Sequence, residues 1–417
     1  MLINMMNLAK IEEVVKDQMD NFKNKSLGVG RNIDFKKYIS TKQITIISGV
    51  RRCGKSTLLL QFSKHFDKFY YFNFDDERLI DFDVSDFENL MLAFKKMYEG
   101  KVIFLDEIQN IAGWERFARR IYEEGYKIFI TGSNAKLLSS ELATHLTGRY
   151  FKIELFPFSF KEFLDYKDIN YQEKGTAIKA QVLKNFDIFL KNGGFPEFIE
   201  HGDSEYLKRI YEDVLYKDLI ARFNIREIKS FKQLANFLFT NFTREISYNG
   251  LKNTLGFKSV TSVKDYVDFI EQSYLIFELY KYDCSLKKQY VSDKKSYVID
   301  NGLRNFIAFS FLDDNGKLLE NLVFIELKRR GYEFYYYKNN NECDFIIREK
   351  GKITQVLQIT AILNENNAER EKAGLIDAMG AFKLKDGLIL TNNQEDIIKK
   401  DNMSIKIMPV WKWLLDL

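Results

Sequence analysis

A glycine-rich stretch at residues 43–57, QITIISGVRRCGKST, has the composition of a phosphate-binding loop. Gly49 and Gly54 bracket the turn, and the spacing G-x-x-x-x-G-K-S lets backbone N–H groups curl around phosphates where a Cβ would obstruct them. Lys55 is placed to reach the β- and γ-phosphate oxygens, and the Ser56 hydroxyl is placed to bind Mg²⁺. The predicted nucleotide site consists of Gly49, Val50, Arg51, Arg52, Cys53, Gly54, Lys55, Ser56 and Thr57.

An acidic pair, Asp106 and Glu107, directly follows the apolar run 102–105. A continuous apolar run is typical of a strand buried on both faces of a parallel sheet, and ligands gather at the carboxyl ends of such strands. We expect Asp106 to help hold Mg²⁺ and Glu107 to orient and deprotonate the attacking water. A solvated strand end is the alternative, but the pair occurs together with a phosphate loop, which favours the functional interpretation.

Three further residues are candidates for contact with the γ-phosphate. Ser133 and Asn134 follow the next predicted strand, 127–131, where a phosphate sensor would lie. Arg149 is the candidate arginine finger, because the transition state of phosphoryl transfer carries negative charge that an added cation stabilises. An ordinary surface salt bridge is an equal alternative for Arg149. Catalysis is thus expected from Glu107, Lys55 and Arg149.

The elements that must position these residues alternate between strand and helix from residue 43 to residue 150. Ile44, Ile46 and Ile47 predict a buried strand before the loop. The following helix has an apolar face made by Leu58, Leu59, Leu60 and Phe62. A strand at 69–74 and a helix at 87–98 continue the alternation, after an N-terminal helix at about 8–22. This order predicts a doubly wound α/β sheet of the P-loop NTPase class.

Composition sets wider bounds. A chain of 417 residues suggests two or three domains, and the net charge of +4 permits nucleic-acid binding without arguing for it. The three cysteines form neither a metal spacing nor a disulfide framework, which points to a reducing compartment. No apolar run reaches the length of a membrane span. We therefore expect a soluble, cytoplasmic protein.

Several segments together resemble a family of archaeal and bacterial AAA-type ATPases. They are GVRRCGKST, VIFLDEIQN, ITGSNAKLL, LTGRYFKIELFPFSFKEF and GGFPEF. Members of that family join a P-loop domain to a C-terminal domain of uncharacterised role with a nuclease-like fold. The resemblance covers most of the chain and implies ATP as the nucleotide, an AAA-like core and a helical lid at about 157–227.

The middle of the chain predicts a winged helix-turn-helix, with helices at 248–255 and 261–273 and strands at 275–282 and 296–300. The second helix, which would enter the major groove of DNA, is acidic and would be repelled by phosphates. The predicted wing is basic, with Lys281, Lys287, Lys288, Lys294 and Lys295. Any DNA contact would therefore use backbone phosphates and be insensitive to sequence. Winged helices also serve as packing modules, and both interpretations stay open.

The last third of the chain predicts a helix, three strands, a helix and a strand between residues 317 and 391. That order resembles the core of the PD-(D/E)XK nucleases. The resemblance implies Glu320 on the first helix and Asp344 on the second strand as candidate metal ligands. In active members the third strand supplies a carboxylate and, two residues later, a lysine that activates water beside Mg²⁺.

The third strand departs from that pattern. Two registers are open, with Gln355 and Leu357 or with Gln358 and Thr360 at the two positions. In both registers the carboxylate is replaced by an amide and the lysine is absent. Because hard cations prefer charged oxygen ligands, we expect a catalytically silent module that keeps only vestigial metal ligands.

The expected organisation is an AAA-like P-loop domain with its N-terminal helix (1–156), a helical lid (157–230), a winged helix-turn-helix (231–310) and an inactive PD-(D/E)XK-like α/β domain (311–417). The expected function is an ATPase that couples Mg-ATP hydrolysis to rearrangement of its C-terminal domains on a macromolecular partner. Duplex DNA is one candidate partner, and a protein partner or an oligomer is another. A slow nucleotide-gated interaction switch and an ATP-dependent nuclease are the alternatives.

Overall fold

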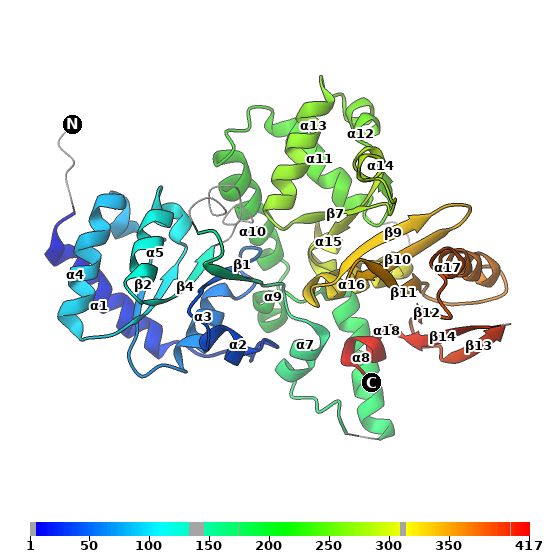
Figure 1. The fold of residues 1–417 in the computed structure, drawn as a ribbon, viewed down its shortest axis with the longest axis horizontal. Helices are drawn as coiled ribbons and strands as arrows, with labels where there is room; N and C mark the ends of the chain where they lie inside the picture. Colours follow the sequence, from blue (N-terminus) through cyan, green and yellow to red (C-terminus); the bar gives the residue numbers. More distant parts are fainter. Residues whose placement is uncertain (1–5, 133–145, 174, 309–313, 401) are drawn as a thin grey trace. The chain divides into compact units, whose positions relative to one another are not determined.

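The computed structural model of the chain describes residues 6–132, 146–173, 175–308, 314–400 and 402–417. The chain divides into two compact units, Met1–Leu155 and Phe156–Leu417. The first unit runs from blue to cyan in Figure 1, and the second runs from green to red. Within the described ranges, every helix is too short or too polar to cross a lipid bilayer.

A five-stranded parallel sheet forms the centre of the first unit, in the order β2-β3-β4-β1-β5. The strands are β1 (Ile44–Ser48), β2 (Tyr70–Asn73), β3 (Val102–Asp106), β4 (Lys127–Gly132) and β5 (Tyr150–Glu154). The strand order reverses at β1, which lies between β4 and β5. Open α/β sheets bind ligands at such a switch point, beyond the carboxyl ends of the strands.

Helices cover both faces of this sheet. They are α1 (Leu8–Asn24), α2 (Phe35–Ile39), α3 (Lys55–Ser63), α4 (Phe87–Met97) and α5 (Trp114–Glu123). Phe22 of α1 stacks on Tyr71 with ring centroids 3.8 Å apart, and Phe94 of α4 stacks on Tyr70 at 4.7 Å. Successive strand residues point to opposite faces, so α1 and α4 pack against opposite faces of the edge strand β2, and the two helices contact each other past that edge. The prediction of an α/β unit with a parallel sheet is confirmed.

The second unit begins with helices. They are α7 (Phe160–Tyr166), α8 (Thr176–Asn192), α9 (Pro196–His201), α10 (Glu205–Asp213), the π-helical stretch η5 (Val214–Ala221) and α11 (Ile228–Thr240). Helices α7 to α10 and η5 occupy the segment in which the sequence predicts a helical lid, whereas α11 lies mostly in the segment predicted as the winged helix-turn-helix.

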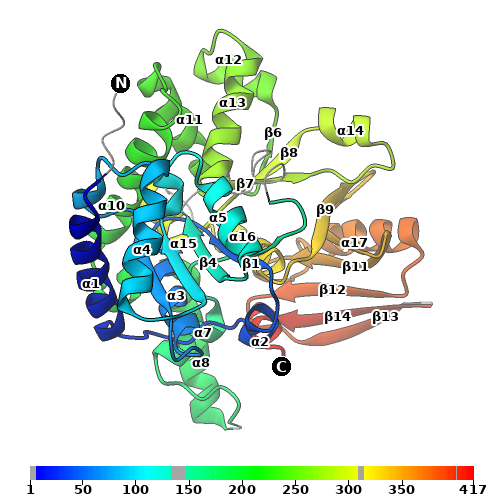
Figure 2. The same cartoon turned by 60° about the vertical axis from the view of Figure 1, so that its left-hand side comes forward.

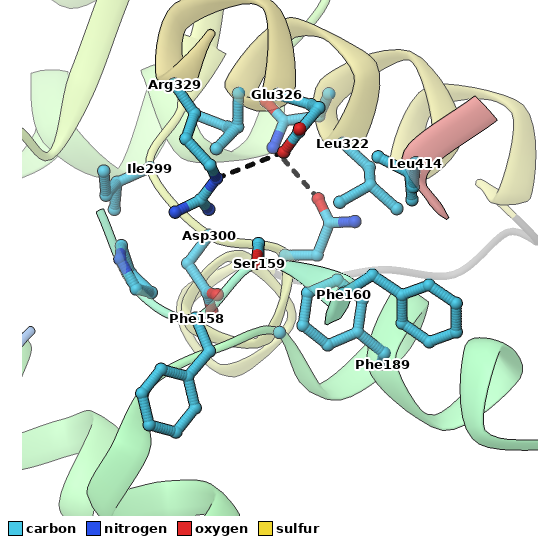
Figure 3. Close-up of a pocket in the computed structure, with 15 residues that line it drawn as sticks. Phe158, Ser159, Phe160, Phe189, Ile299, Asp300, Leu322, Glu326, Arg329 and Leu414 are labelled. Carbon is cyan, nitrogen blue, oxygen red and sulfur yellow. Dashed lines mark hydrogen bonds and ion pairs between the residues drawn. The ribbon is translucent and has the colours of Figure 1, made fainter. Parts of the chain in front are cut away.

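The two glycines of the GGFPEF segment follow α8 and have a packing role. A Cβ on Gly193 would lie 2.1 Å from the Asp300 carboxylate, and a Cβ on Gly194 would lie 2.3 Å from the Phe158 carbonyl oxygen. The Gly194 N–H donates to Asp300 Oδ2 at 2.6 Å. Asp300 and Phe158 also line a cavity of about 20 Å³ (Figure 3). A cavity of this size holds about one water molecule, and the close approaches at the two glycines explain why packing of this segment needs residues without a Cβ.

A small antiparallel sheet, in the order β6-β8-β7, follows the helices. Its strands are β6 (Glu245–Ile246), β7 (Ile276–Tyr280) and β8 (Lys294–Val298), and its helices are α12 (Tyr248–Leu255), α13 (Val260–Gln272), α14 (Leu286–Val291) and α15 (Asn301–Ile307). The predicted helix pair and strand pair are present, but α14 within the predicted wing was not anticipated. Lys294 and Lys295, which we expected on a basic wing surface, are only 5% and 3% exposed.

A six-stranded sheet closes the chain, in the order β13-β14-β12-β11-β10-β9 (Figure 2). Its elements are α16 (Asn315–Arg329), β9 (Glu333–Lys338), β10 (Glu342–Glu349), β11 (Lys352–Ile359), α17 (Ala368–Phe382), β12 (Asp386–Thr391), β13 (Asp396–Lys400), β14 (Met403–Pro409) and α18 (Val410–Leu415). Helix α17 packs its buried residues Leu375, Ala378 and Met379 on this sheet. The helix, three strands, helix and strand were predicted, whereas the last two strands and α18 were not.

Candidate nucleotide-binding site

The phosphate loop, residues 49–54, leaves the carboxyl end of β1 and enters α3. Two of its glycines are needed for backbone reasons. A Cβ on Gly49 would lie 2.1 Å from the Leu155 carbonyl oxygen, and Gly54 has a φ of +99° at the start of α3. The N-cap residue of α3 is Gly54, which has no side chain to cap the helix, so the first N–H groups of α3 and the positive end of its dipole can face an anion. The loop therefore has the form that a phosphate group requires.

Lys55 is the first residue of α3, and its side chain turns back into the loop. Its Nζ donates to the carbonyl oxygens of Gly49 at 3.2 Å and of Val50 at 3.1 Å, and the residue is 5% exposed. These acceptors are neutral carbonyls, and a phosphate oxygen forms a stronger, charge-assisted hydrogen bond with an ammonium group. Lys55 is thus held at the loop in a position from which it can transfer its hydrogen bonds to a phosphate.

Contacts with residues outside the motif hold the loop in place. Cys53 Sγ donates to the Leu155 carbonyl oxygen at 3.4 Å, and burial raises the pKa of Cys53, which stays a neutral thiol. Arg31 Nη1 donates to the Cys53 carbonyl oxygen at 3.1 Å. Gln61 of α3 donates to the carbonyl oxygens of Leu27 at 2.8 Å and Val29 at 2.7 Å. The segment before α2 is thereby fixed against the loop, a role that no local pattern in the sequence signals.

Asp106 ends β3 at the same edge of the sheet. Thr131 of β4 pairs with Ile47 of β1, and the adjoining β3–β4 register places Asp106 beside Thr131. The Tyr71 hydroxyl donates to Asp106 Oδ2 at 3.0 Å, and the Thr131 hydroxyl donates to Oδ1. Burial, reinforced by Asp106, raises the pKa of Tyr71, so this hydroxyl remains a donor. The carboxylate is 2% exposed and fixed in orientation.

Glu107 follows in the left-handed conformation, with φ +54°. Its N–H donates to Thr131 Oγ1 at 3.0 Å. Burial raises the pKa of Glu107, Lys55 opposes the rise and Asp106 adds to it. A carboxylate with a raised pKa is suited to take a proton near neutral pH. Gln109 Nε2 donates to Glu107 Oε2.

Gln109 also carries an orphaned acceptor. Among the described residues, its Oε1 is buried and has no hydrogen-bond partner. Buried polar groups are seldom left unpaired in proteins. A water molecule bound beside Glu107 could donate to this oxygen, which makes Gln109 a functional candidate that the sequence analysis did not identify.

The oxygen ligands and N–H groups at this edge fit Mg²⁺ and a nucleoside triphosphate. Mg²⁺ prefers hard oxygen ligands, and the oxygens available at this edge are the Ser56 hydroxyl and the Asp106 carboxylate. Backbone N–H groups of the loop, with Lys55, would hold the β- and γ-phosphates. When bound, Mg²⁺ would neutralise charge on the phosphate oxygens. The predicted residues from 49 to 57 and the acidic pair thus meet at one edge of the sheet.

Thr131 connects the two acids, which leads to a testable prediction. Thr131→Val keeps the shape of the side chain but leaves an Asp106 oxygen and the Glu107 N–H without their partner. We expect the free energy of unfolding to fall by about 1–3 kcal/mol, and ATP turnover to fall more than nucleotide binding. Denaturant unfolding and steady-state hydrolysis measure the two effects. Thr131→Ser keeps the hydroxyl and should retain most of both, and equal losses in the Ser and Val variants would contradict this role.

Arg149 lies away from the phosphate loop of its own chain. It precedes β5, which runs parallel to β1 with Ile44 opposite Tyr150, so Arg149 stands at the amino end of β1. A five-residue strand spans roughly 16 Å, and the loop leaves the other end. Arg149 Nη2 instead lies 3.7 Å from Glu123 Oε1. The salt-bridge alternative therefore describes Arg149 within one chain. Ser133 and Asn134 lie outside the described residues.

The second unit brings its two candidate metal ligands together. Glu320 of α16 and Asp344 of β10 both lie 3.2 Å from the same ammonium nitrogen, Lys295 Nζ. Phe345 pairs with Leu357, which places Asp344 beside Gln358 and favours the register with Gln358 and Thr360 over the one with Gln355 and Leu357. The sequence analysis treated a lysine as missing from this centre. The structure supplies one from β8, which no pattern within the nuclease-like segment could have indicated.

Comparison with known proteins identifies three family segments in the chain. An AAA domain matches residues 41–164. Two domains of unknown function, DUF8612 and DUF4143, match residues 183–314 and 315–413.

Two relatives and one solved structure are similar to larger parts of the chain. An uncharacterized protein of Methanocaldococcus jannaschii is 39% identical and covers 97% of this chain and 95% of its own length. An uncharacterized protein of Haemophilus influenzae is 32% identical over 91% of this chain and 96% of its own length. A STAND-type signal transduction ATPase with a tetratricopeptide repeat sensor from Pyrococcus horikoshii is 15% identical, with a TM-score of 0.29, over 74% of this chain and 46% of that chain.

The TM-score of 0.29 for the STAND-type ATPase is too low to establish a shared fold over the whole chain. The two sequence relatives, by contrast, match almost from end to end. The chain therefore belongs to the same family as these two uncharacterized proteins, and it carries an AAA domain followed by two domains of unknown function.

Proposed function

We propose that the chain is an ATPase that binds Mg-ATP at the phosphate loop and couples its hydrolysis to rearrangement of the C-terminal domains on a macromolecular partner. The observation that carries this proposal is the pair of acids joined by Thr131. It sets an aspartate fixed by two hydroxyl groups beside a glutamate whose pKa burial raises. Both acids lie at the edge of the sheet from which the phosphate loop leaves.

The residues divide the reaction between them. The loop N–H groups and Lys55 hold the β- and γ-phosphates, and Ser56 and Asp106 hold Mg²⁺. Glu107 takes a proton from water as the water oxygen bonds to the γ-phosphorus, and the bond to the bridging oxygen breaks to release ADP. The Gln109 Oε1 orients this water by accepting its second hydrogen. The products are ADP, inorganic phosphate and a proton that returns to solvent from Glu107.

A slow nucleotide-gated interaction switch is the second candidate. The specific observation in its favour is the position of Arg149, which pairs with Glu123 at the far end of β1 and β5. Without an added cation at the γ-phosphate, hydrolysis by a P-loop protein is slow. In that case the bound nucleotide would govern which partner is held, and turnover would only reset the state.

Steady-state ATP hydrolysis with and without duplex DNA distinguishes these functions. An ATPase that works on DNA should hydrolyse ATP on its own and faster with any duplex. A switch should hydrolyse slowly whatever is added, while its capture of a partner should differ between ATP and ADP. Absence of both nucleotide binding and hydrolysis would contradict both proposals.

The predicted wing provides the proposed DNA contact. After the correction for Lys294 and Lys295, its exposed lysines are Lys287 and Lys288 on α14. We expect binding that is weak, insensitive to sequence and steeply dependent on salt, because these lysines lie on the predicted wing and not on the helix that would enter the major groove, and would contact backbone phosphates. The double variant Lys287→Glu and Lys288→Glu should lose affinity for every duplex alike, with the slope of log Kd against log salt reduced by about 2. Fluorescence anisotropy with scrambled duplexes measures both quantities.

The same charge change elsewhere provides the control. Lys383 and Lys385 are also exposed, and their double substitution by Glu should leave DNA binding unchanged. Equal weakening by both double variants would indicate a general charge effect and remove the wing from the proposal. Tight preference for one duplex at physiological salt would contradict phosphate-only contact.

We also propose that the second unit recognises partners and has no nuclease activity. The position equivalent to the third-strand carboxylate is the amide of Gln358, and Thr360 stands at the lysine position. The natural chain should therefore leave supercoiled plasmid intact with Mg²⁺ or Mn²⁺, with or without ATP.

A further inference from the structure

Lys295 places a buried ammonium group in the middle of an acidic centre. Its Nζ lies 2.7 Å from Glu342 Oε1, 3.2 Å from Glu320 Oε1 and 3.2 Å from Asp344 Oδ1. Lys295 itself is 3% exposed. The lysine comes from β8 of the three-stranded sheet, whereas the acids come from α16 and β10 of the six-stranded-sheet region. One side chain therefore connects three elements of the second unit.

The acids are fixed by further hydrogen bonds. The Tyr297 hydroxyl donates to Glu320 Oε1 at 2.6 Å, and the Ile359 N–H donates to Asp344 Oδ2 at 2.9 Å. Lys338 lies 3.5 Å from Glu342 Oε2. Each carboxylate thus uses one or more oxygens on partners within the protein, and none of the three is free to turn outward without breaking a contact.

Gln358 occupies the place of a fourth acid. Its Oε1 accepts from the Asp344 N–H at 3.3 Å, and its Nε2 donates to Glu371 Oε2 at 2.8 Å. An amide can serve an N–H and a carboxylate at once, which a carboxylate in the same place could not do. A neutral amide therefore stands where a fourth negative charge would be, and it both accepts and donates a hydrogen bond within the centre.

Charge balance also fits a resident ammonium. A buried charge is tolerated only when it is paired and hydrogen-bonded. Here three carboxylate oxygens lie within 3.2 Å of the Lys295 ammonium nitrogen. The lysine thus offsets part of the repulsion among the acids.

The distances leave no place for a metal while the lysine is present. Metal ions of this kind bind oxygen at about 2.0–2.6 Å, at the centre of the same group of oxygens that the ammonium contacts. Among the described residues, no three His, Cys, Asp or Glu side chains are arranged to hold a metal ion. The lysine ammonium and a divalent ion therefore cannot occupy this centre at the same time.

We propose that the ammonium group of Lys295 is the built-in cation of this centre, in the position that a divalent ion would otherwise fill, and that it ties β8 to α16 and β10. This deepens, and rests on, the proposal that the second unit has no nuclease activity. The centre then serves as an internal ionic link between the two sheets of the second unit. The described acids are not arranged as metal ligands while the lysine is present. Removing the ammonium should let the three carboxylates move together around a divalent ion, because they then lack their shared cation.

The test is the response of Lys295→Met to Mn²⁺ in nucleotide-free full-length protein. Without divalent ions, the variant should melt about 10 °C below the natural chain, because three acids lose their shared partner. Mn²⁺ should restore most of that loss in a saturable manner, whereas the Tm of the natural chain should not respond. The double variant Lys295→Met with Asp344→Asn should lose the Mn²⁺ response.

Lys294→Met is the matched control. Lys294 is its neighbour on β8, equally buried, but its Nζ donates to the carbonyl oxygens of Tyr290 and Ser292, each at 3.2 Å. Its loss should produce no Mn²⁺ response. ATP hydrolysis by the same samples reports on the first unit separately. Intact hydrolysis with no rescue would overturn the Lys295 proposal alone, and lost hydrolysis with intact rescue would count against the ATPase proposal alone.

Three results would overturn the role of Lys295. The first is a folded Lys295→Met protein whose Tm does not change with Mn²⁺. The second is a Lys295→Met protein that fails to fold even with Mn²⁺. The third is a natural chain whose Tm rises with Mn²⁺ and loses that rise in Asp344→Asn. Plasmid cleavage by the natural chain that Asp344→Ala abolishes would also reject it, and would make the nuclease the leading function of this unit.

Discussion

Glu107→Gln is expected to bind Mg-ATP as tightly as the natural chain while its hydrolysis rate falls about 10²- to 10⁴-fold. The amide keeps the size of the side chain and its place beside Thr131 and Gln109, but it cannot accept a proton from water. The phosphates are held by other residues, so the affinity should not change. Isothermal titration with a non-hydrolysable nucleotide and a phosphate-release assay measure the two properties.

Glu88→Gln is the matched control for this substitution. Glu88 lies exposed on α4 of the same unit, so the change should leave both affinity and rate unaltered. Hydrolysis by Glu107→Gln at the natural rate would show that another group activates the water. A loss of affinity as large as the loss of rate would place Glu107 in nucleotide binding instead.

Lys55→Ala should remove nucleotide binding as well as turnover. A charged hydrogen bond contributes about 1.5–3 kcal/mol, and the ammonium also bonds the Gly49 and Val50 carbonyl oxygens, which shape the loop. Affinity should therefore fall by at least about 10- to 100-fold, with hydrolysis at background. Lys64→Ala, at the exposed far end of α3, should bind and hydrolyse normally. Normal nucleotide affinity in Lys55→Ala would contradict the assignment of the phosphate site.

The two variants also separate a motor-like ATPase from a switch. In both cases they are inactive in solution, but Glu107→Gln should stay in the ATP-bound state and Lys55→Ala in the nucleotide-free state. A partner captured by one variant and not by the other would support nucleotide gating. Equal capture by both would argue against it.

The sequence was most informative where chemistry depends on neighbours along the chain. The phosphate loop is one continuous segment, and the acidic pair is recognised by the apolar strand before it, so both could be predicted with their strands. The order of helix, three strands, helix and strand in the nuclease-like segment was also predicted. Alternating and continuous apolar patterns are local properties that survive without knowledge of the fold.

The contacts that were missed join residues far apart in the chain. Thr131 reaches Asp106 across 25 positions, and Lys295 reaches Glu320 and Asp344 across 25 and 49 positions. Lys295 looked like one more surface lysine of a basic wing, because nothing in its neighbourhood shows that its side chain points inward. Its burial depends on how β8 meets the six-stranded-sheet region, and this arrangement is set by packing over the whole unit.

The position of Arg149 could not be predicted for a different reason. It was chosen for its charge, but it directly precedes β5, a strand that was not predicted and that runs parallel to β1. Residues before such a strand lie at the edge opposite the ligand edge. The direction of β5 therefore argues against an arginine finger acting within one chain, and the ion pair with Glu123 agrees with that argument.

The central claim is that the first unit hydrolyses Mg-ATP at the phosphate loop. The most direct measurement is phosphate release by the purified full-length chain at saturating Mg-ATP, with Lys55→Ala and Glu107→Gln prepared in parallel. We expect release by the natural chain at a rate at least about 100-fold above both variants, and release that requires a divalent ion. Release at the same rate in all three proteins, or none above the buffer background in the natural chain, would contradict the account.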